Sequence, residues 1–236
     1  MIMRIFSLAL ALILTFFGSS VFAHAIWIES SPTGVKGKQQ TVRVYYGEYE
    51  HAQIEKTTDW YSDLSQLEVY LVQPDQSRVK LSLTDKGEWL EASFIPATEG
   101  TYTIYTSHVA KDLWEEKRFQ FSSSVAVQVG KSQNQPASIS AYCLSAAAQQ
   151  YIRGNNVAIV LNKKGSPLTD KEVTIMAPQG WVKKLTTDTQ GNLNFDAGFA
   201  GIYIIEYGQN EDEPGNWNGN SYKETWQTVT TSVVVK

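Results

Sequence analysis

Apolar and polar residues alternate in short runs along most of this 236-residue chain. The alternation is clearest at residues 41–49 (TVRVYYGEY), 67–71 (LEVYL), 125–129 (VAVQV), 157–161 (VAIVL) and 231–236 (TSVVVK). Runs of this length, rich in Val, Ile, Thr and Tyr, are typical of β-strands, because successive side chains of a strand point to opposite faces. Turn-forming pairs such as Pro74-Asp75 and Gln190-Gly191 separate the runs. The pattern therefore predicts an all-β protein.

Two segments depart from this alternation. Residues 145–152 (SAAAQQYI) predict about two helical turns, and residues 57–66 (TTDWYSDLSQ) predict one more turn behind an Asp or Thr cap. No segment shows a long apolar period of 3.6 residues, so helices are expected to be minor elements.

A polar stretch with Gly and Pro, residues 130–138 (GKSQNQPAS), follows the apolar strand at 125–129. It predicts a linker at residues 131–138 between an N-terminal domain (24–130) and a C-terminal domain (139–236). The two halves share a short pattern: GTYTI at residues 100–104 recurs as GIYII at residues 201–205, 101 positions later. We therefore expect two consecutive Ig-like or prealbumin-like β-sandwich domains of similar size.

The second half has further turn and strand markers in a fixed order. They are Gly165, Pro167, Leu168, Val173, Thr187, Asp188, Gly191, Phe195, Gly201 and Tyr203. This order resembles the prealbumin-like and Cna-B-like sandwiches, with Asp188 to Gly191 as a tight hairpin turn. The resemblance implies a fold and carries no chemistry.

The first 23 residues are typical of a cleaved signal peptide. Arg4 supplies a basic start, residues 5–17 are almost entirely apolar, and Val21-Phe22-Ala23 ends the segment with a small-x-small pattern. The apolar run is too short for a comfortable membrane span, and no Cys lies near the site for a lipid anchor. We therefore expect cleavage after Ala23 and a periplasmic or otherwise exported chain without a transmembrane segment.

Composition excludes several classes of function. The chain has 20 basic and 24 acidic residues, and loss of Arg4 with the signal peptide leaves a mildly acidic surface, which argues against nucleic-acid binding. The single cysteine, Cys143, excludes an intramolecular disulfide and is expected to be a small buried apolar residue. The sequence has no G-x-S-x-G, H-E-x-x-H or P-loop motif, so we expect no enzyme.

All three histidines, His24, His51 and His108, lie in the first half. If cleavage follows Ala23, His24 offers its α-amine and imidazole Nδ1 to one metal ion in a closed chelate ring. A free α-amine and a free imidazole titrate near pH values of about 7.7–8.0 and about 6.5, so both are available near neutrality. These nitrogens suit nickel, cobalt, copper and zinc. The alternative is that His24 merely follows the signal peptide.

The surroundings of His51 are acidic. If the strand through residues 41–49 continues, Glu48 and Glu50 share one face and His51 faces the other way. His108 ends the run at residues 101–108, where a rigid strand end can hold a ligand, and it is the weakest of the three candidates. The candidate metal ligands are His24, His51, His108, Glu48 and Glu50.

Residues 24–56 (HAIWIESSPTGVKGKQQTVRVYYGEYEHAQIEK) are similar to the opening of a family of periplasmic proteins linked to nickel and cobalt uptake. That family is catalogued mainly as a domain of unknown function or as a nickel-transport-complex accessory protein. The matching positions are His24, Trp27, Ile28, Glu29, Val42, Val44, Tyr46, Gly47 and Glu48. The resemblance implies a metal-binding or metal-delivery role with His24 as a ligand and a membrane transporter component as partner.

Other interpretations stay open. Copper carriers of the CopC type and lytic polysaccharide monooxygenases also begin with a mature His on a β-sandwich, and the latter would make this a copper-dependent oxidase. A structural or interaction module that binds a glycan or a protein at the cell surface is also consistent with the many Trp and Tyr residues. Most of these aromatic residues are expected in cores, with Trp217 the best candidate for an exposed one.

Overall fold

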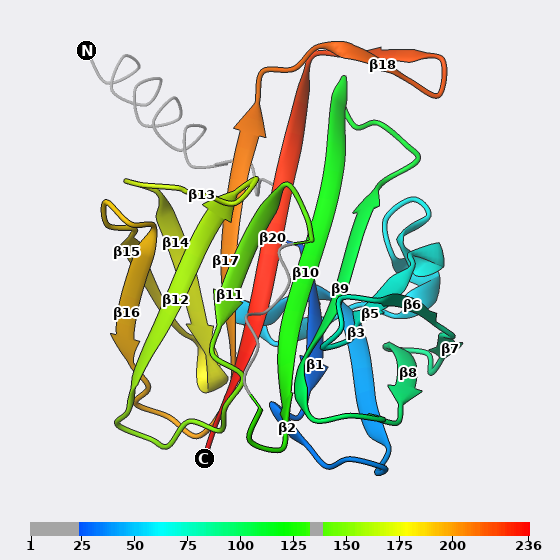
Figure 1. The fold of residues 1–236 in the computed structure, drawn as a ribbon. Coiled ribbons are helices and arrows are strands. Elements are labelled where there is room, and N and C mark those ends of the chain that lie inside the picture. Colours follow the sequence, from blue (N-terminus) through cyan, green and yellow to red (C-terminus); the bar gives the residue numbers. More distant parts are fainter. Residues whose placement is uncertain (1–23, 133–138) are drawn as a thin grey trace, which may run out of the picture.

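The computed structural model describes residues 24–132 and 139–236 and consists almost entirely of β-strands (Figure 1). The predicted signal peptide (residues 1–23) and most of the predicted linker (133–138) lie outside the described residues. The strands of the first half are β1 (Ala25–Ser30), β2 (Thr33–Gly34), β3 (Gln40–Glu48), β4 (Gln53–Ile54), β5 (Val69–Val72), β6 (Arg78–Leu81), β7 (Thr84–Asp85), β8 (Leu90–Phe94), β9 (Gly100–Val109) and β10 (Lys117–Val129). Those of the second half are β11 (Tyr142–Ala146), β12 (Asn156–Lys163), β13 (Ser166–Pro167), β14 (Glu172–Ala177), β15 (Trp181–Thr186), β16 (Asn192–Asp196), β17 (Gly201–Glu211), β18 (Gly215–Trp217), β19 (Asn220–Tyr222) and β20 (Glu224–Val235).

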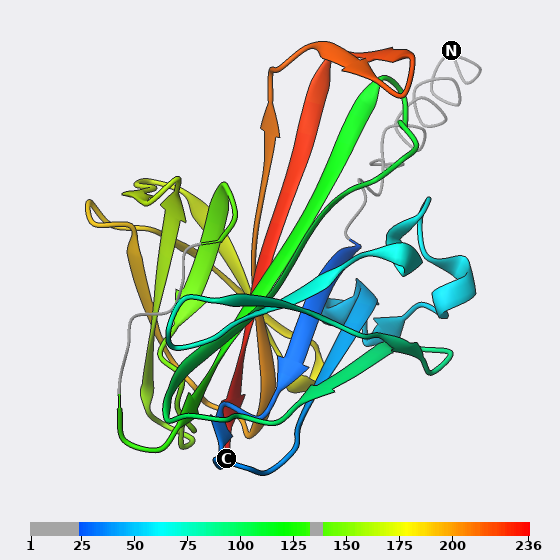
Figure 2. The same ribbon diagram turned by 45° about the vertical axis from the view of Figure 1, so that its right-hand side comes forward.

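One sheet, here called the central sheet, runs through both halves of the chain. Its strand order is β15-β14-β17-β20-β10-β9-β5-β6, with β2 paired to β10. The two halves meet where β10 and β20 pair in parallel, from Lys117 opposite Glu224 to Ser123 opposite Thr230. The ends of β10 and β20 rise above the rest of the molecule and approach the β18–β19 hairpin (Figure 2).

Two smaller sheets cover opposite faces of the central sheet. The first outer sheet (β1-β3-β8-β7, with β4) packs on the first half, and the second outer sheet (β11-β12-β13, with β16) packs on the second half. The hydrophobic core of the first half, here called the first core, includes Phe121 of β10, which pairs with Thr228 of β20. The next residue of β20, Val229, belongs to the core of the second half, here called the second core. Because neighbouring residues of a strand point to opposite faces, the two cores lie on opposite faces of one sheet. The predicted Ig-like β-sandwich architecture is confirmed.

The strand order is symmetric about the β10–β20 pair. In the outer sheets β3 pairs with β1 and β8, while β12 pairs with β11 and β16; in the central sheet β9 pairs with β5 and β10, while β17 pairs with β14 and β20. The repeated tyrosine has the same contact in each half: Thr98 O accepts from Tyr102 Oη at 3.0 Å, and Phe199 O accepts from Tyr203 Oη at 3.2 Å. The GTYTI and GIYII segments are therefore equivalent positions of a structural repeat.

Hydroxyl groups of the central sheet hold β1, the edge strand of the first outer sheet. Thr230 donates to Ile26 O and Ser232 donates to Ile28 O, both at 2.7 Å, while Ile28 N donates to Ser123 Oγ at 3.1 Å. Backbone groups of a buried edge strand need such partners. These bonds fix the position of β1 and so of the residue before it, His24.

Three local expectations differ from the structure. Residues 145–152 form no helix: β11 runs to Ala146 and Tyr151 makes a bridge to Val235. Residues 57–66 hold two short 3₁₀ turns, η3 (Thr57–Asp59) and η4 (Leu64–Gln66). Two further turns are η2 (Tyr49–His51) and η5 (Pro178–Gly180). Trp217 is partly buried rather than exposed, because its indole donates to Ala110 O at 2.9 Å.

The turn at Asp188 forms as expected but joins different strands. The carboxylate of Asp188 accepts from the backbone N–H groups of Gln190 and Asn192, both at 2.8 Å. The strands on either side, β15 and β16, belong to different sheets, so the turn is not a hairpin. As expected, Cys143 is a buried free thiol. No helix among the described residues has the length and apolar character needed to cross a membrane.

Candidate functional site

His24 lies directly before β1, with its imidazole between two carboxylates. Its Nε2 is 3.0 Å from Glu55 Oε1, and its Nδ1 is 3.4 Å from Glu48 Oε1. The ring also packs at 5.2 Å, centroid to centroid, against the buried Tyr46. About a quarter of the side chain remains exposed (24%). The imidazole is therefore oriented by its neighbours and still reachable from solvent.

Glu48 connects His24 to a second imidazole. Its other carboxylate oxygen, Oε2, is 3.0 Å from Nδ1 of His51, three residues along the chain. His51 closes the turn η2, and 65% of its side chain is exposed. We name His24, Glu48, His51 and Glu55 the N-terminal cluster. In it, the two oxygens of one carboxylate face the Nδ1 atoms of both histidines.

The backbone at Gly47 allows this arrangement. Gly47 has a φ of +155°, and a Cβ atom there would lie 2.2 Å from the carbonyl oxygen of Gln53. The short strand β4 can therefore pair against the end of β3, with Gly47 opposite Ile54. The turn closes through Ala52 in the left-handed region (φ 52°), and Glu55 N then donates to Tyr46 O at 2.9 Å. This return of the chain carries Glu55 to the ring of His24.

The carboxylate of Glu55 is suited to remain ionised. Hydrogen bonding to His24, followed in importance by that from Gln53, holds the pKa of Glu55 below its ordinary value. Burial and the charge of Glu55 raise the pKa of the Tyr46 hydroxyl, so that ring stays neutral beside the imidazole. The cluster therefore offers two imidazoles and anionic oxygen in one place, which are donors for a divalent transition metal.

Glu50, one of the five expected metal ligands, is not part of the N-terminal cluster. The prediction placed Glu48 and Glu50 on one face and His51 on the other, but β3 ends at Glu48 and residues 49–51 turn in η2. Glu48 therefore contacts His51 instead. Glu50 lines a hollow of about 420 Å³ between η2 and η5 together with Trp27, Gln179 and His51, and no contact joins its carboxylate to His24 or Glu48 among those the structure gives.

His108 lies in a different environment from the N-terminal cluster. Its Nε2 is 2.9 Å from Asp63 Oδ1, and the same oxygen accepts from Lys111 N at 2.9 Å. The ring borders a hollow of about 650 Å³ together with Tyr70 and Tyr105. Of the five predicted ligands, the structure thus brings together His24, Glu48 and His51 through direct contacts, and it gives Glu50 and His108 other neighbours.

Glu55 is not among the five ligand candidates that the sequence suggests. The signal was present in the glycine before Glu48, because a chain that reverses at Gly47 must return along β3. Within residues 24–132 and 139–236, no group of three or more His, Cys, Asp or Glu side chains is placed so that it could hold a metal ion. The N-terminal cluster is a hydrogen-bonded set of donors, and the α-amine expected after cleavage is not a side chain.

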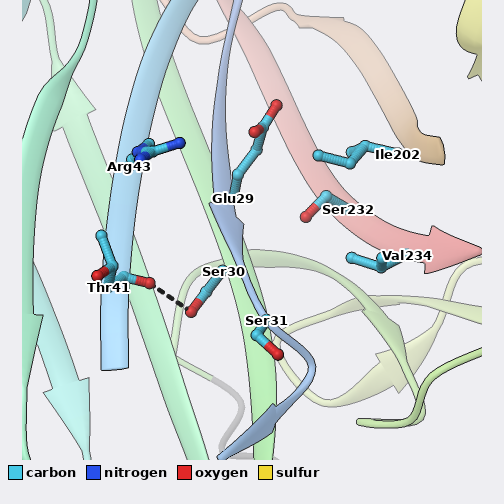
Figure 3. A pocket seen from close by; sticks show the side chains of 8 residues that line it. All are labelled: Glu29, Ser30, Ser31, Thr41, Arg43, Ile202, Ser232 and Val234. Carbon is cyan, nitrogen blue, oxygen red and sulfur yellow. Dashed lines mark hydrogen bonds between the residues drawn. The ribbon is translucent and has the colours of Figure 1, made fainter. Parts of the chain in front are cut away.

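Another hollow, of about 330 Å³, is lined mainly by residues of β1 and β3 from the first half and of β17 and β20 from the second half (Figure 3). Glu29 and Arg43 line it from neighbouring strands, and burial raises the pKa of Glu29 while the bond from Trp27 Nε1 and the charge of Arg43 oppose that rise. Its hydroxyl groups serve the fold: Ser30 donates to Thr41 O at 2.8 Å and Ser232 donates to Ile28 O. This lining is explained by the attachment of β1.

No family model matches the chain, and no curated protein matches it. Among solved structures, fibronectin(III)-like modules of Clostridium thermocellum CbhA share 12% identity, over 88% of this chain and 94% of that chain, with a TM-score of 0.26. A segment of two fibronectin type III domains from chicken tenascin shares 11% identity, over 88% and 97%, with a TM-score of 0.26. At such TM-scores the likeness carries no argument about what this chain binds.

Proposed function

We propose that this chain is an exported, non-enzymatic protein that binds a divalent transition metal ion at the N-terminal cluster. The observation that supports this most is the position of Glu48. Its two oxygens lie 3.4 Å from Nδ1 of His24 and 3.0 Å from Nδ1 of His51. One carboxylate thus lies beside the Nδ1 nitrogens of both imidazoles and can add an oxygen donor to an ion held there. The carboxylate that orients the His24 ring is Glu55, which accepts from Nε2 at 3.0 Å and so leaves Nδ1 as the nitrogen that binds the ion.

Cleavage after Ala23 would complete the donor set. The new α-amine and Nδ1 of His24 can chelate one ion, and Nδ1 is the nitrogen that faces Glu48. The cluster has no thiolate, and the single cysteine, Cys143, is buried and hydrogen-bonded toward Leu144 O in the second half. Nitrogen and oxygen donors without sulfur favour nickel, cobalt, copper(II) or zinc over copper(I).

A delivery role agrees with the exposure of the cluster. His51 is largely exposed and sits on a short turn, so a second protein can approach an ion bound beside it. The sequence resemblance implies nickel or cobalt uptake with a membrane transporter component as the recipient. The ion is then cargo, which the cluster must release as well as bind.

Calorimetry on two forms of the protein tests this proposal. One form begins at His24, and the other carries one extra glycine before His24, which converts the amine to an amide. We expect one site for nickel, copper(II) or zinc in the first form and at least tenfold weaker binding in the second. Equal affinity of the two forms would remove the N-terminal chelate from the account.

The same titration separates the copper interpretations from the nickel and cobalt one. Nitrogen and oxygen sites in general bind copper(II) more tightly than nickel, cobalt or zinc. A carrier of the CopC type would show a larger preference for copper(II) than this general order predicts. An oxidase would in addition produce peroxide from ascorbate above the rate of free copper. We expect no such turnover, since the carboxylate of Glu48 lies between the two imidazoles of the cluster, with one oxygen facing Nδ1 of His24 and the other facing Nδ1 of His51.

A further inference from the structure

A hollow bordered by aromatic side chains lies on the first half of the central sheet, away from the N-terminal cluster. It has a volume of about 650 Å³, and its lining includes Gln66, Glu68, Tyr70, Arg78, Tyr105 and Ser107. Tyr70 pairs with Tyr105 across β5 and β9, and Tyr105 pairs with Ser124 of β10. These side chains lie on the face opposite the first core, because Leu71 and Ile104 between them belong to that core.

The centre of this face is a flat aromatic surface. The rings of Tyr70 and Tyr105 stack with their centroids 5.5 Å apart and their planes 25° from parallel. Tyr105 is buried beside the sheet, while Tyr70 remains partly exposed. A cross-strand stack holds the exposed ring in a fixed orientation at little cost in side-chain entropy on binding. The C–H face of a sugar ring can pack on such a surface.

Neutral hydrogen-bonding groups continue the face toward β10. Gln120 Nε2 donates to Ser107 Oγ at 3.1 Å, and Ser122 Oγ donates to the same hydroxyl at 3.0 Å. Ser107 and Gln120 are accessible at the edge of this row. Amide and hydroxyl groups both donate and accept, so they can exchange bonds with the hydroxyl groups of a ligand.

Two titratable groups of the hollow, Glu68 and His108, have partners beside it. Glu68 bonds to Lys80 and to the hydroxyl of Tyr70, and His108 bonds to Asp63. With Glu68 and Arg78 both in the lining, the hollow has an acidic and a basic side chain rather than a single sign of charge. An uncharged ligand rich in hydroxyl groups can gain hydrogen bonds from these same side chains.

The equivalent face of the second half is covered, whereas this face of the first half is exposed to solvent. The positions equivalent to Tyr70 and Tyr105 in the second half are Thr174 and Glu206, which pair across β14 and β17. There the turn η2 packs against β14, and the hydroxyl of Tyr49 donates to Ile202 O at 2.5 Å. Among the described residues, the corresponding site on the first half is a hollow lined by aromatic and polar side chains.

We propose that this hollow binds a neutral saccharide chain, with one sugar ring packed on Tyr70 and its hydroxyl groups bonded to Gln66, Glu68 and Arg78. The site is independent of the N-terminal cluster. A protein partner is the competing occupant, since a surface of Tyr and Ser side chains also suits protein contacts. The mixture of a single stacked aromatic pair with amide, hydroxyl and paired charged groups, rather than an apolar patch, favours the saccharide.

The test is calorimetric titration of the full mature chain with uncharged hexasaccharides: cellohexaose, maltohexaose and chitohexaose. We expect at least one of them to bind, and Tyr70→Ala to weaken that binding about tenfold or more. Tyr70→Phe should retain most of it, since the ring face remains. Phe199→Ala removes a partly exposed aromatic ring in the second half and should leave binding unchanged.

Either of two outcomes would overturn the proposal: none of the three hexasaccharides binds, or Tyr70→Ala binds one of them as tightly as the unaltered chain does. In the first case, loss in Tyr70→Ala of a self-association seen by sedimentation would make the face a protein interface. Circular dichroism of Tyr70→Ala checks that the variant is folded, and nickel or copper binding by the same variant should be unchanged.

Discussion

Glu48 is the residue on which the geometry of the N-terminal cluster depends. It is the last residue of β3, it is partly buried, and each of its oxygens faces one imidazole. A neutral amide in its place has the same shape but presents one donor and one acceptor, so it cannot accept from both rings. Its charge also offsets the positive charge of a bound ion.

Glu48→Gln should therefore weaken metal binding about tenfold or more while changing the free energy of unfolding little, since the contacts it loses are partly exposed. Titration with nickel and copper(II) measures the first effect, and urea unfolding the second. Glu50→Gln is the matched control, because it removes a carboxylate two residues away, whereas the contacts of His24 and His51 are to Glu48. Equal losses in the two variants would show that only general negative charge matters.

Glu206 should make the free energy of unfolding depend on pH, independently of metal binding. Burial against β14 and β20, with the nearby charge of Glu50, raises the pKa of Glu206 from 4.5 to about 7. The folded state then holds this proton more tightly than the unfolded state, so stability falls as pH rises from 4.5 to 7. Glu206→Gln should flatten that part of the profile and stabilise the chain at pH 8.

The measurement is the urea midpoint at several pH values between 4 and 8 for the unaltered chain, Glu206→Gln and Glu213→Gln. Glu213 is exposed and serves as the control. An unchanged slope in Glu206→Gln would assign the pH dependence to other groups.

Among single residues, the sequence indicates His24 as a candidate metal ligand because its position next to a cleavage pattern is a local feature. It did not place Glu48 against His51, since a continued strand would put the two side chains on opposite faces, and the contact arises because β3 ends at Glu48 and the chain turns in η2. It could not show that Glu55 reaches His24, because that contact spans 31 residues and depends on how β4 pairs. The separation of His108 from the others depends in the same way on long-range pairing.

Among the elements, the turn after β3 has the largest effect on the site. Gly47→Ala would bring a methyl group to 2.2 Å from Gln53 O and demand a φ of +155° from a residue with a Cβ. We expect a loss of about 2 kcal/mol or more in the free energy of unfolding, and weaker metal binding because Glu55 moves away from His24.

Gly198→Ala is the control for this substitution. Gly198 has no other atom within 4 Å of the added Cβ and no φ in the left-handed range, so its change should be within about 0.5 kcal/mol. A Gly47→Ala variant with unaltered stability and metal affinity would show that the turn is not a determinant of the site.

The strands themselves are largely predictable, since alternation of Val, Ile, Thr and Tyr marks β3, β5, β10 and β12 directly. The segment after β11 was misjudged as a helix. Ala and Gln favour helices, but Tyr151 of this segment is buried against the second core and bridges Val235 of β20, so tertiary contacts outweigh local propensity.

At the scale of the whole molecule, β10 and β20 join the halves. Seven consecutive residue pairs form this parallel contact, and Thr230 and Thr231 bond across it to Ser123 and Ser124. Alternation indicates which face of a strand is buried, but it does not indicate the partner strand. The sequence could therefore predict two sandwiches and not that they share one sheet.

Because the halves share a sheet, we expect the chain to unfold in a single cooperative transition. Urea unfolding followed by tryptophan fluorescence and by far-ultraviolet circular dichroism should give coincident curves. Residues 139–236 expressed alone should show lower stability than the full chain, since β20 then loses β10. Two separate transitions, with the isolated half as stable as in the full chain, would instead indicate independent domains.

We propose that His24 with Glu48 holds a divalent metal ion. The most direct measurement is the anomalous scattering of nickel, copper or zinc in crystals of protein that begins at His24. We expect one strong peak about 2 Å from Nδ1 of His24 and from its α-amine, on the side of the ring that faces Glu48. A peak only at His108 and Asp63, or no ordered ion in crystals grown with each metal, would contradict it.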